Sequence, residues 1–532
     1  MRPLRLPYAL PRLRNSSRAR ARGITVAAGV TALAVTLSGC ALPFLPASDE
    51  VDPLNPRSMS AEWQAENFPA YYAQDIVWEE CTEVDGYDAW TADGLEAAGY
   101  DLDQVACASV AAPLDWEDPS NEASIDLRIV HLPAPGGEPL GTLLANPGGP
   151  GATGVDFMLG MALSPGFEEV GANYDLLGFD PRGIGSSSPL ACDGAGSELT
   201  VVQLGACVAE EPLAHTMGTS QVARDMELLR ALAGDPKLNF LGYSYGTMLG
   251  ATYATIFPEL VGRMVLDSAE NAQWASPIHL FDQAVAIANA TVALATACQT
   301  EYQGEVEVCP FVDEDSLLAV LAGLNAEPLV ASDGTRITGD DLQGYLTSAL
   351  YESHVDRGRT LDTIALALFG DQEAIDAIGE NFSGEGIPDM AMLVVTCHSF
   401  PIEPDIPGLL AHIEEVGMPR LLGGPEIADA TLAPFIDLSC YALPESGLDI
   451  TDAFDAAGAD PILVIGITGD HATPFQYAQV LVDELGDATL LTLDGQGHSA
   501  SFSDRSTCVD EAVSRYLVDG SMPAPGTVCL DD

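Results

Sequence analysis

Positive charge is scarce in this chain: 20 lysines and arginines stand against 79 aspartates and glutamates in 532 residues. The net charge of −59 argues against a nucleic-acid-binding protein, because contacts to phosphates require clustered basic residues. Only eight histidines occur, and none belongs to a His-Glu-x-x-His motif, so the sequence predicts no metal site. A P-loop and a dinucleotide-binding fingerprint are also absent, and we expect no cofactor.

The start of the chain has no apolar run long enough to cross a membrane. The run Ile24–Leu37 has about 14 residues, whereas a membrane-spanning helix needs about 20. Seven of the basic residues are arginines before Gly23, and no acidic residue precedes Asp49. A basic start, a short apolar run and small residues at its end predict a signal peptide over residues 1–39.

The signal peptide ends in Leu37-Ser38-Gly39-Cys40, which resembles a bacterial lipobox. In a lipobox the cysteine is lipidated and becomes the first residue of the mature protein. We therefore expect an exported lipoprotein, anchored through Cys40 on the outer side of the cell membrane. The alternative is an ordinary signal peptide in which Cys40 is incidental. Because acidic residues dominate after Gly23, anionic lipid heads would repel the protein surface, and the lipid would provide the attachment.

None of the 11 cysteines belongs to a Cys-x-x-Cys motif, which argues against a zinc ribbon. Without Cys40, ten remain, and an even number in an exported chain favours disulfides over buried free thiols. The sequence does not prove their connectivity, and we predict bridges between neighbours along the chain. The predicted pairs are Cys81 with Cys107, Cys192 with Cys207, Cys298 with Cys309, Cys397 with Cys440, and Cys508 with Cys529.

The chain divides into regions of different character. Residues 40–77 begin with a proline-rich stretch without periodicity, which predicts a linker. Over 78–270, short apolar strands alternate with helices, an arrangement typical of a parallel sheet. Helical periodicity dominates 271–459, and strands return over 460–532. We therefore predict one α/β domain interrupted by a largely helical lid insertion. The clearest expected strands are 125–131, 141–145, 174–179, 238–241, 263–266, 461–467 and 488–493.

The strongest motif is Gly242-Tyr243-Ser244-Tyr245-Gly246. An expected strand precedes it and an expected helix follows, which is the context that gives a G-x-S-x-G pattern meaning. A serine on such a tight turn stands exposed, next to a helix N-terminus that favours developing negative charge. We therefore predict that Ser244 is a nucleophile, in preference to a residue of a plain glycine-rich turn.

A second glycine-rich loop, Asn146-Pro-Gly-Gly-Pro-Gly151, follows an expected strand about 95 residues before Ser244. Its main-chain N–H groups can point at a single oxygen atom. We predict an oxyanion hole formed by the N–H of Tyr245 and that of Gly148 or Gly149. The alternative is an ordinary turn.

The expected base and acid both follow strands. His498 comes directly after the strand 488–493, and Asp470 comes shortly after the strand 461–467. His471 is the second candidate for the base, whereas Asp494 is too close to His498 and follows the wrong strand. The order Ser244, Asp470, His498 is that of a triad in the α/β-hydrolase fold, which is the fold we predict.

Several stretches resemble the tripeptidyl aminopeptidase family of secreted actinobacterial serine peptidases, relatives of prolyl aminopeptidase. They are NPGGPG at 146–151, GFDPRGIGSSSP at 178–189, the elbow segment 242–267, GDHATPFQYA at 469–478, GQGHS at 495–499 and the final cysteine pair. The resemblance implies a peptide substrate and the release of short peptides from a free N-terminus.

Two positions depart from this family. Its members often carry an acidic residue two positions after the cysteine that matches Cys397, where this chain has Ser399. The strand after the elbow continues into Ser268-Ala269-Glu270 instead of a Gly-Val-rich turn, and Glu270 is a candidate to receive the substrate ammonium. An esterase or lipase with the same triad is the second hypothesis, and a non-catalytic surface-binding protein is the third. The sequence makes no prediction of oligomeric state.

Overall fold

The fold is built around one large sheet. In this computed structural model the described residues are 59–192, 199–302, 306, 308–382, 389–425, 427, 432, 435–436, 439–450 and 453–531. The predicted signal peptide, Cys40 and residues 40–58 of the predicted linker lie outside them. Within the described residues the sheet has nine strands in the order β1-β2-β4-β3-β5-β6-β9-β10-β11. These are β1 (Ala106–Pro113), β2 (Ser124–Leu132), β3 (Thr142–Asn146), β4 (Asp175–Phe179), β5 (Leu238–Tyr243), β6 (Val261–Asp267), β9 (Ile462–Gly469), β10 (Ala488–Gln496) and β11 (Val528–Leu530).

Strand direction follows the connections. Strand β2 runs antiparallel to both β1 and β4. The remaining neighbours in the sheet, along β4-β3-β5-β6-β9-β10-β11, all pair in parallel. The seven strands expected from the sequence all form. The chain adds β1 and β11, which are an alanine-rich strand and a three-residue strand with little apolar signal. The predicted mostly parallel α/β sheet is confirmed.

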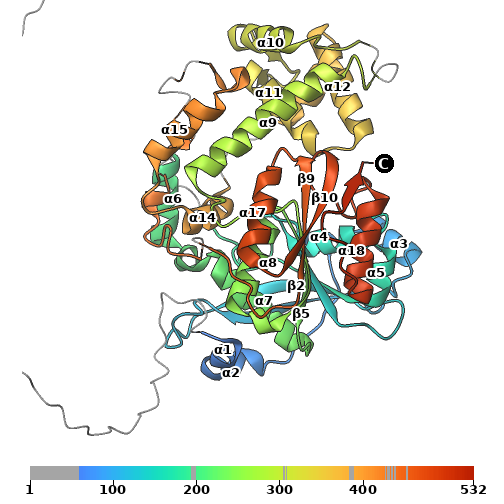
Figure 1. The fold of residues 1–532 in the computed structure, drawn as a ribbon, viewed down its shortest axis with the longest axis vertical. Coiled ribbons are helices and arrows are strands. Elements are labelled where there is room, and N and C mark those ends of the chain that lie inside the picture. The colour runs from blue at the N-terminus through green and yellow to red at the C-terminus, as the bar shows by residue number, and fades with distance from the viewer. Residues whose placement is uncertain are drawn as a thin grey trace, which may run out of the picture. The chain divides into compact units, whose positions relative to one another are not determined.

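Helices cover both faces of this sheet (Figure 1). Leu144, Phe240 and Leu266 point to one face, where α7, α8 and α17 pack, and their neighbours Leu143, Leu241 and Val265 point to the other, where α3, α4, α5 and α18 pack. Such alternation buries both faces and explains the apolar character of the strands. The core helices are α3 (Ala89–Ala97), α4 (Gly154–Met161), α5 (Glu168–Asn173), α6 (Thr200–Glu210), η3 (Pro212–Thr216), α7 (Thr219–Ala233), α8 (Tyr245–Ile256), η4 (Pro258–Leu260), α17 (Phe475–Leu485) and α18 (Thr507–Asp519).

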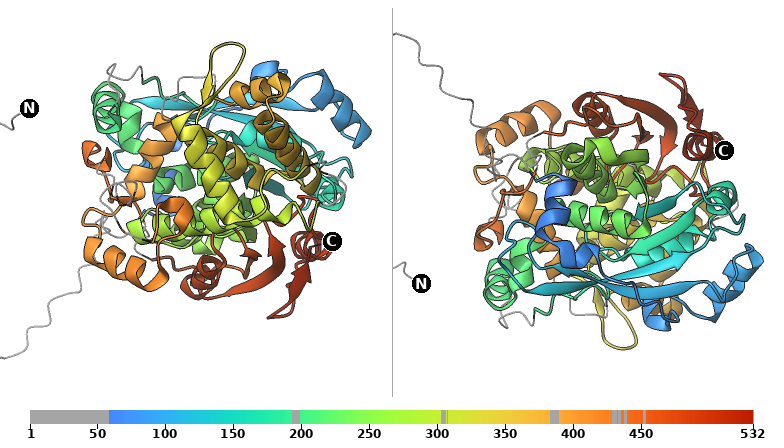
Figure 2. Two further views of the ribbon diagram at one scale, coloured as in Figure 1. Left: turned by 90° about the horizontal axis from the view of Figure 1, so that it is seen from above. Right: turned by 90° about the horizontal axis from the view of Figure 1, so that it is seen from below.

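The segment between β6 and β9 is the insertion, which lies beyond the sheet edge at which β9 and β10 end (Figures 1 and 2). It is mostly helical and has its own apolar cluster around Leu317, Ile337 and Ile364. A two-stranded ribbon, which the sequence did not indicate, also forms there. The elements are α9 (Pro277–Ala297), α10 (Glu314–Ala326), β7 (Leu329–Val330), β8 (Arg336–Ile337), α11 (Gly339–Ser348), η5 (Ala349–Tyr351), α12 (His354–Leu368), α13 (Gln372–Glu380), α14 (Met390–Ser399), α15 (Ile406–Val416), η6 (Arg420–Leu422) and η8 (Ser439–Ala442).

Helix α9 has 21 residues and contains an 18-residue stretch with a mean hydropathy of 1.3, so its length and composition alone would allow it to cross a membrane. Its polar contacts show another role. Gln283 donates a hydrogen bond of 2.6 Å to the carbonyl oxygen of Ala472, and Asp282 accepts one of 2.6 Å from the Tyr477 hydroxyl. Both partners belong to the sheet domain, so α9 connects the lid to the core.

The second half of the predicted linker is instead folded onto the core. Residues 61–72 form α1 (Ala61–Asn67) and α2 (Pro69–Tyr72). Phe68 is buried against the ring of Trp116, with 5.0 Å between centroids, and Gln64 donates to the carbonyl oxygen of Arg224 over 2.9 Å. The expectation of a linker was wrong over these residues, because the aromatic side chains that follow the proline-rich stretch provide surface to bury.

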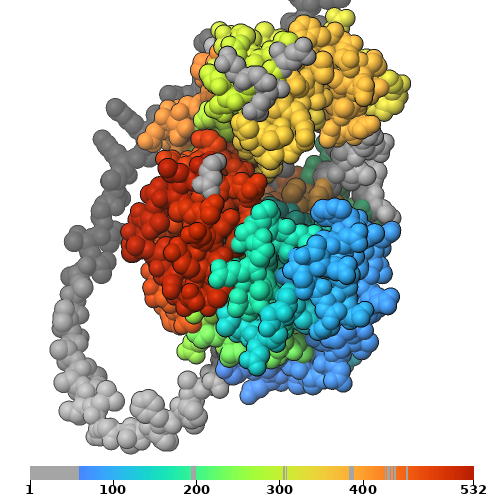
Figure 3. Space-filling model, turned by 90° about the vertical axis from the view of Figure 1, so that its right-hand side faces the viewer, coloured from blue at the N-terminus to red at the C-terminus, as the bar shows by residue number. Residues whose placement is uncertain are grey.

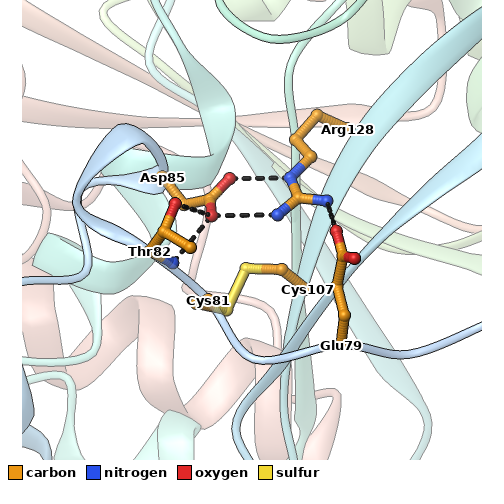
Figure 4. Close-up of a disulfide and its surroundings, with 6 residues drawn as sticks. All are labelled: Glu79, Cys81, Thr82, Asp85, Cys107 and Arg128. Atoms are coloured by element: carbon orange, nitrogen blue, oxygen red, sulfur yellow. Dashed lines mark hydrogen bonds and ion pairs between the residues drawn. A yellow bond between two sulfur atoms is a disulfide. The ribbon is translucent and has the colours of Figure 1, made fainter.

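The described cysteines form the five predicted pairs, which confirms the connectivity. Figure 4 shows how the Cys81–Cys107 bridge is supported. Next to it, Arg128 donates to both carboxylate oxygens of Asp85, at 2.6 and 2.9 Å, and to Glu79 at 2.5 Å. The bridge and these ion pairs attach the segment before β1 to the edge of the sheet.

Candidate active site

Ser244 lies on the turn between β5 and α8. Its backbone has φ 54° and ψ −124°, which is unfavourable for a residue with a side chain. Two close approaches make the turn possible. A Cβ atom on Gly242 would lie 2.4 Å from the carbonyl oxygen of Gly246, and one on Gly246 would lie 2.6 Å from that of Asn146. The glycines of the motif are therefore required by packing, as expected for a strained nucleophile turn.

The loop after β3 packs directly on this turn. A Cβ atom on Gly148 would lie 2.8 Å from the Cβ atom of Ser244 and 3.0 Å from the main-chain nitrogen of Tyr245. The N–H of Gly148 donates to the side-chain oxygen of Asn146 over 2.9 Å, so it is already used. No hydrogen bond between described residues uses the N–H of Gly149. Of the two alternatives for the oxyanion donor, the structure therefore favours Gly149.

His498 and Asp470 lie side by side beyond the ends of β10 and β9. The Nδ1 atom of His498 is 3.0 and 3.1 Å from the two carboxylate oxygens of Asp470. A carboxylate accepts hydrogen bonds, so Nδ1 carries the proton and Nε2 is left to act as an acceptor. The Asp470 side chain has no exposed surface, and that of His498 is 8% exposed. The pair is thus well shielded from water.

The pKa values of this pair move in opposite directions. Burial by itself raises the pKa of Asp470, but the charge and hydrogen bond of His498 and the N–H of Thr473 outweigh it, so the pKa is lowered. Burial lowers the pKa of His498, but the charge and hydrogen bond of Asp470, with Asp267 and Glu270, raise it above its ordinary value. The site therefore stabilises an imidazolium, which is what a general base becomes when it takes a proton.

Two family models match this chain. One, described as an α/β-hydrolase fold, matches residues 141–292, and the other, described as a TAP-like protein, matches residues 429–529. Serine protease Hip1 of Mycobacterium tuberculosis is 31% identical over 473 residues, which cover 80% of this chain and 87% of the relative. Carboxylesterase B of the same species is 30% identical over 463 residues, covering 80% and 86%. Tripeptidyl aminopeptidase of Streptomyces coelicolor is 27% identical over 495 residues, covering 85% and 86%.

The chain belongs to the tripeptidyl aminopeptidase family of α/β-hydrolases. It is therefore a serine hydrolase, and the predicted family and enzyme class are confirmed.

A family member needs one histidine as base, and the structure separates the two candidates. His471 is buried, and among the described residues it makes no ion pair, whereas His498 pairs with Asp470. Burial lowers the pKa of His471 to about 4, so its ring stays neutral. Its Nε2 atom has no hydrogen-bond partner among the described residues. His471 packs instead against the ring of Tyr351, with 4.6 Å between centroids, which favours His498 over His471 as the candidate base.

Glu270, the candidate for receiving a substrate ammonium, is buried near the site. Its Oε2 atom is in contact with Nε2 of His279, and the ring of His279 stacks on Tyr477 at 3.7 Å between centroids. The main-chain N–H of Glu270 donates to the Thr247 hydroxyl over 3.1 Å. Its carboxylate is thus held by α9, and its charge acts on His498.

A second carboxylate, that of Glu403, lines the same cavity as Ser399, the residue at the position where family members often carry an acid. The Ser399 side chain is buried, and its hydroxyl has no partner among the described residues. Ser399 lines a cavity together with Glu403, Gln273 and Ser276. The sequence pattern gave no reason to select Glu403, because it is four residues beyond the position at which the family carries its acid.

The lid reaches over the site. Tyr351, at the end of η5, lies edge-on to His498 with 5.8 Å between centroids. At the start of α14, Asp389 and Met392 approach Gly151 of the predicted oxyanion loop, since a Cβ atom there would lie 3.2 and 3.4 Å from them. Figure 3 shows a recess between the yellow lid and the turquoise part of the core.

Across the ranges that the structure describes, no three His, Cys, Asp or Glu side chains are grouped so that they could hold a metal ion.

Proposed function

We propose that this chain is an exported, lipid-anchored serine exopeptidase that releases short peptides from free N-termini. Ser244, His498 and Asp470 form its triad. The observation that carries the triad is the paired geometry of His498 and Asp470 at the strand ends next to the strained Ser244 turn. The exopeptidase activity is supported by the 27% identity to a tripeptidyl aminopeptidase and by the lid over the site.

The reaction proceeds through an acyl-enzyme. Nε2 of His498 takes the hydroxyl proton of Ser244 as Oγ forms a bond to the scissile carbonyl carbon. The carbonyl oxygen becomes an oxyanion, to which the N–H groups of Tyr245 and Gly149 donate. Collapse of this intermediate breaks the C–N bond, and the imidazolium gives its proton to the leaving amine. In the second half of the reaction, His498 takes a proton from water as the water oxygen attacks the acyl carbon of the ester. The ester C–O bond then breaks, the imidazolium returns its proton to Oγ of Ser244, and the peptide fragment leaves with a free carboxyl group.

A free N-terminus requires a carboxylate partner, since a buried unpaired ammonium is costly. We propose Glu270 for this role, because its charge lies near His498 and its contact with His279 holds it in place. Glu403 is the second candidate, because it lines a cavity that a buried serine also faces. The strongly acidic chain favours the approach of cationic N-termini in either case.

An esterase is the second candidate function. The 30% identity to carboxylesterase B favours it, and an ester passes through the same oxyanion intermediate. Hydrolysis rates for matched free-amine peptides, N-acetylated peptides and short esters separate the two. The exopeptidase cleaves free-amine peptides and releases fragments of fixed short length, whereas N-acetylation abolishes cleavage. Equal rates on blocked and free peptides, or faster ester hydrolysis, would replace this proposal with the esterase.

Export and anchoring complete the proposal. Five disulfides are typical of proteins in an oxidising compartment outside the cytoplasm. The sequence Leu37-Ser38-Gly39-Cys40 supports a lipid on Cys40. The partners we propose are a peptide substrate and the membrane, the latter reached through the N-terminal lipid.

A further inference from the structure

The loop that carries His498 has an unfavourable backbone. Within six residues, Ser499, Phe502 and Asp504 have φ values of 67°, 55° and 57°, the left-handed region that favours glycine. Local sequence therefore does not hold this loop, and its shape must come from contacts to the rest of the fold. The position of the imidazole depends on those contacts.

The contacts come mainly from Asp267, the last residue of β6. Its fully buried carboxylate accepts hydrogen bonds from the N–H of Ala500 at 3.0 Å and from the N–H of Ser501 at 2.7 Å. The Ser501 hydroxyl donates to it as well, at 2.5 Å. The Tyr243 hydroxyl lies 3.1 Å from the same Ser501 hydroxyl. Burial raises the pKa of the Asp267 carboxyl, whereas the three donors aimed at it favour its ionised form.

The same end of β6 also holds the nucleophile turn. The N–H of Ser244 donates to the main-chain carbonyl oxygen of Asp267 over 3.0 Å. The hydroxyl of Ser268 accepts from the N–H of Ser499 over 2.8 Å. One strand end therefore fixes the turn that carries Ser244 and the loop that carries His498 relative to each other.

We propose that Asp267 is a positioning residue of the reaction, whose buried carboxylate holds the main chain at 500–501 so that His498 faces Ser244. This inference rests on the proposed triad. It differs from a role in stability alone, because the charge of Asp267 also acts on the imidazole. Small errors in the placement of a base cost rate without weakening substrate binding.

Several charged groups around His498 determine how its pKa responds to a change of charge at Asp267. The groups that act on the ring or on its immediate neighbours are Asp470 after β9, Asp267 and Glu270 at the end of β6, His471, Arg505 in the loop after β10, and Arg357 of α12. Asp267 is one of the carboxylates that raise the pKa of His498. Removal of its charge therefore lowers that pKa, and the neutral base persists to lower pH.

The test measures the rate at which a fluorophosphonate labels Ser244 as a function of pH, which does not depend on peptide specificity. Three variants are compared with the full-length wild type. Asp267→Asn removes the charge, and Asp267→Glu keeps it but alters the geometry. Asp235→Asn is the matched control, because Asp235 also accepts from a main-chain N–H, that of Thr142, but does so at the opposite end of the strands.

We expect Asp267→Asn to label about 10- to 100-fold more slowly at its optimum, with the acid limb moved to lower pH. Asp267→Glu should also be slower, with the acid limb close to that of the wild type, and Asp235→Asn should match the wild type. If Asp267→Asn folds and has the wild-type labelling rate and pH profile, the positioning role of Asp267 is overturned but the proposed triad is not. If Asp267→Asn does not fold, Asp267→Glu decides, because a wild-type labelling rate in that variant also overturns the inference. Absence of label on wild-type Ser244 would instead overturn the triad.

Discussion

Nδ1 of His498 lies 3.0 Å from Oδ1 of Asp470, although the two residues follow different strands, β10 and β9. The strands are parallel neighbours, so the loops after them leave the sheet at the same edge. The hydroxyl of Thr473 donates a hydrogen bond to the other carboxylate oxygen of Asp470 over 2.9 Å and helps to hold the carboxylate in place.

Loss of the nucleophile should abolish the reaction. We expect Ser244→Ala to lower kcat by on the order of 10⁴-fold or more, and His498→Ala to have a similar effect. Because the two groups act as a unit, the double variant should be no worse than either single one. Single-turnover kinetics with a chromogenic substrate measure this. Additive losses, or full activity in Ser244→Ala, would contradict the assignment.

The pH profile of the reaction should reflect the raised pKa of His498. The pKa of His498 is raised chiefly because the Asp470 carboxylate stabilises the imidazolium against the effect of burial. The neutral base is therefore lost as pH falls through a value above that of an ordinary histidine. Asp470→Asn should move this acid limb to lower pH and reduce kcat by on the order of 10⁴-fold. Profiles of kcat/KM for both proteins provide the check, and His471→Gln should leave the limb in place.

Loss of the carboxylate that binds the substrate ammonium should raise KM for free-amine peptides. Glu270→Gln keeps the shape of the side chain but removes the charge, so KM should rise by about 10-fold or more for free-amine peptides. Short uncharged esters should be hardly affected. Glu403→Gln is the paired variant, and if it rather than Glu270→Gln shows this split, the anchor is Glu403. A similar loss on esters and peptides would mean that Glu270 acts only through the fold.

Attachment to the membrane should depend on one side chain. Cys40→Ser removes the predicted lipidation site, so the protein should appear in the medium or accumulate as unprocessed precursor. Membrane fractionation and intact mass of the mature N-terminus measure the outcome. A mature, unlipidated N-terminus well beyond Cys40 in the wild type would show that the lipobox interpretation is wrong.

The contribution of each lid disulfide to the free energy of unfolding should increase with the length of the loop that it closes. Cys397 and Cys440 are 43 residues apart and join α14 to η8, whereas Cys298 and Cys309 are 11 apart. Replacing the first pair by serine should lower the free energy of unfolding by about 2–4 kcal/mol, and replacing the second by less. Thermal unfolding of both variants, with and without reductant, makes the comparison. A larger loss for the short loop would count against the loop-entropy account.

Much of this protein could be predicted from local sequence. Ser244, Asp470 and His498 each follow an apolar strand, and their order along the chain matches one fold, so the sequence alone was enough to propose them as a triad. Neighbouring cysteines could be paired for a similar reason, since short loops bring them together. Periodicity also located seven strands of the sheet, because β strands buried on both faces are almost entirely apolar.

Other features were decided by contacts between distant segments. Nothing local in residues 59–77 indicates that Phe68 meets Trp116, so these residues resembled a linker until their aromatic side chains were placed against the core. The choice between Gly148 and Gly149 depends on the orientation of the Asn146 amide. Asp267 is an acid at a strand end like many others, and its link to Ser501 spans 234 residues. Strand periodicity is encoded within a few residues, whereas hydrogen bonds between loops exist only once the sheet has aligned their ends.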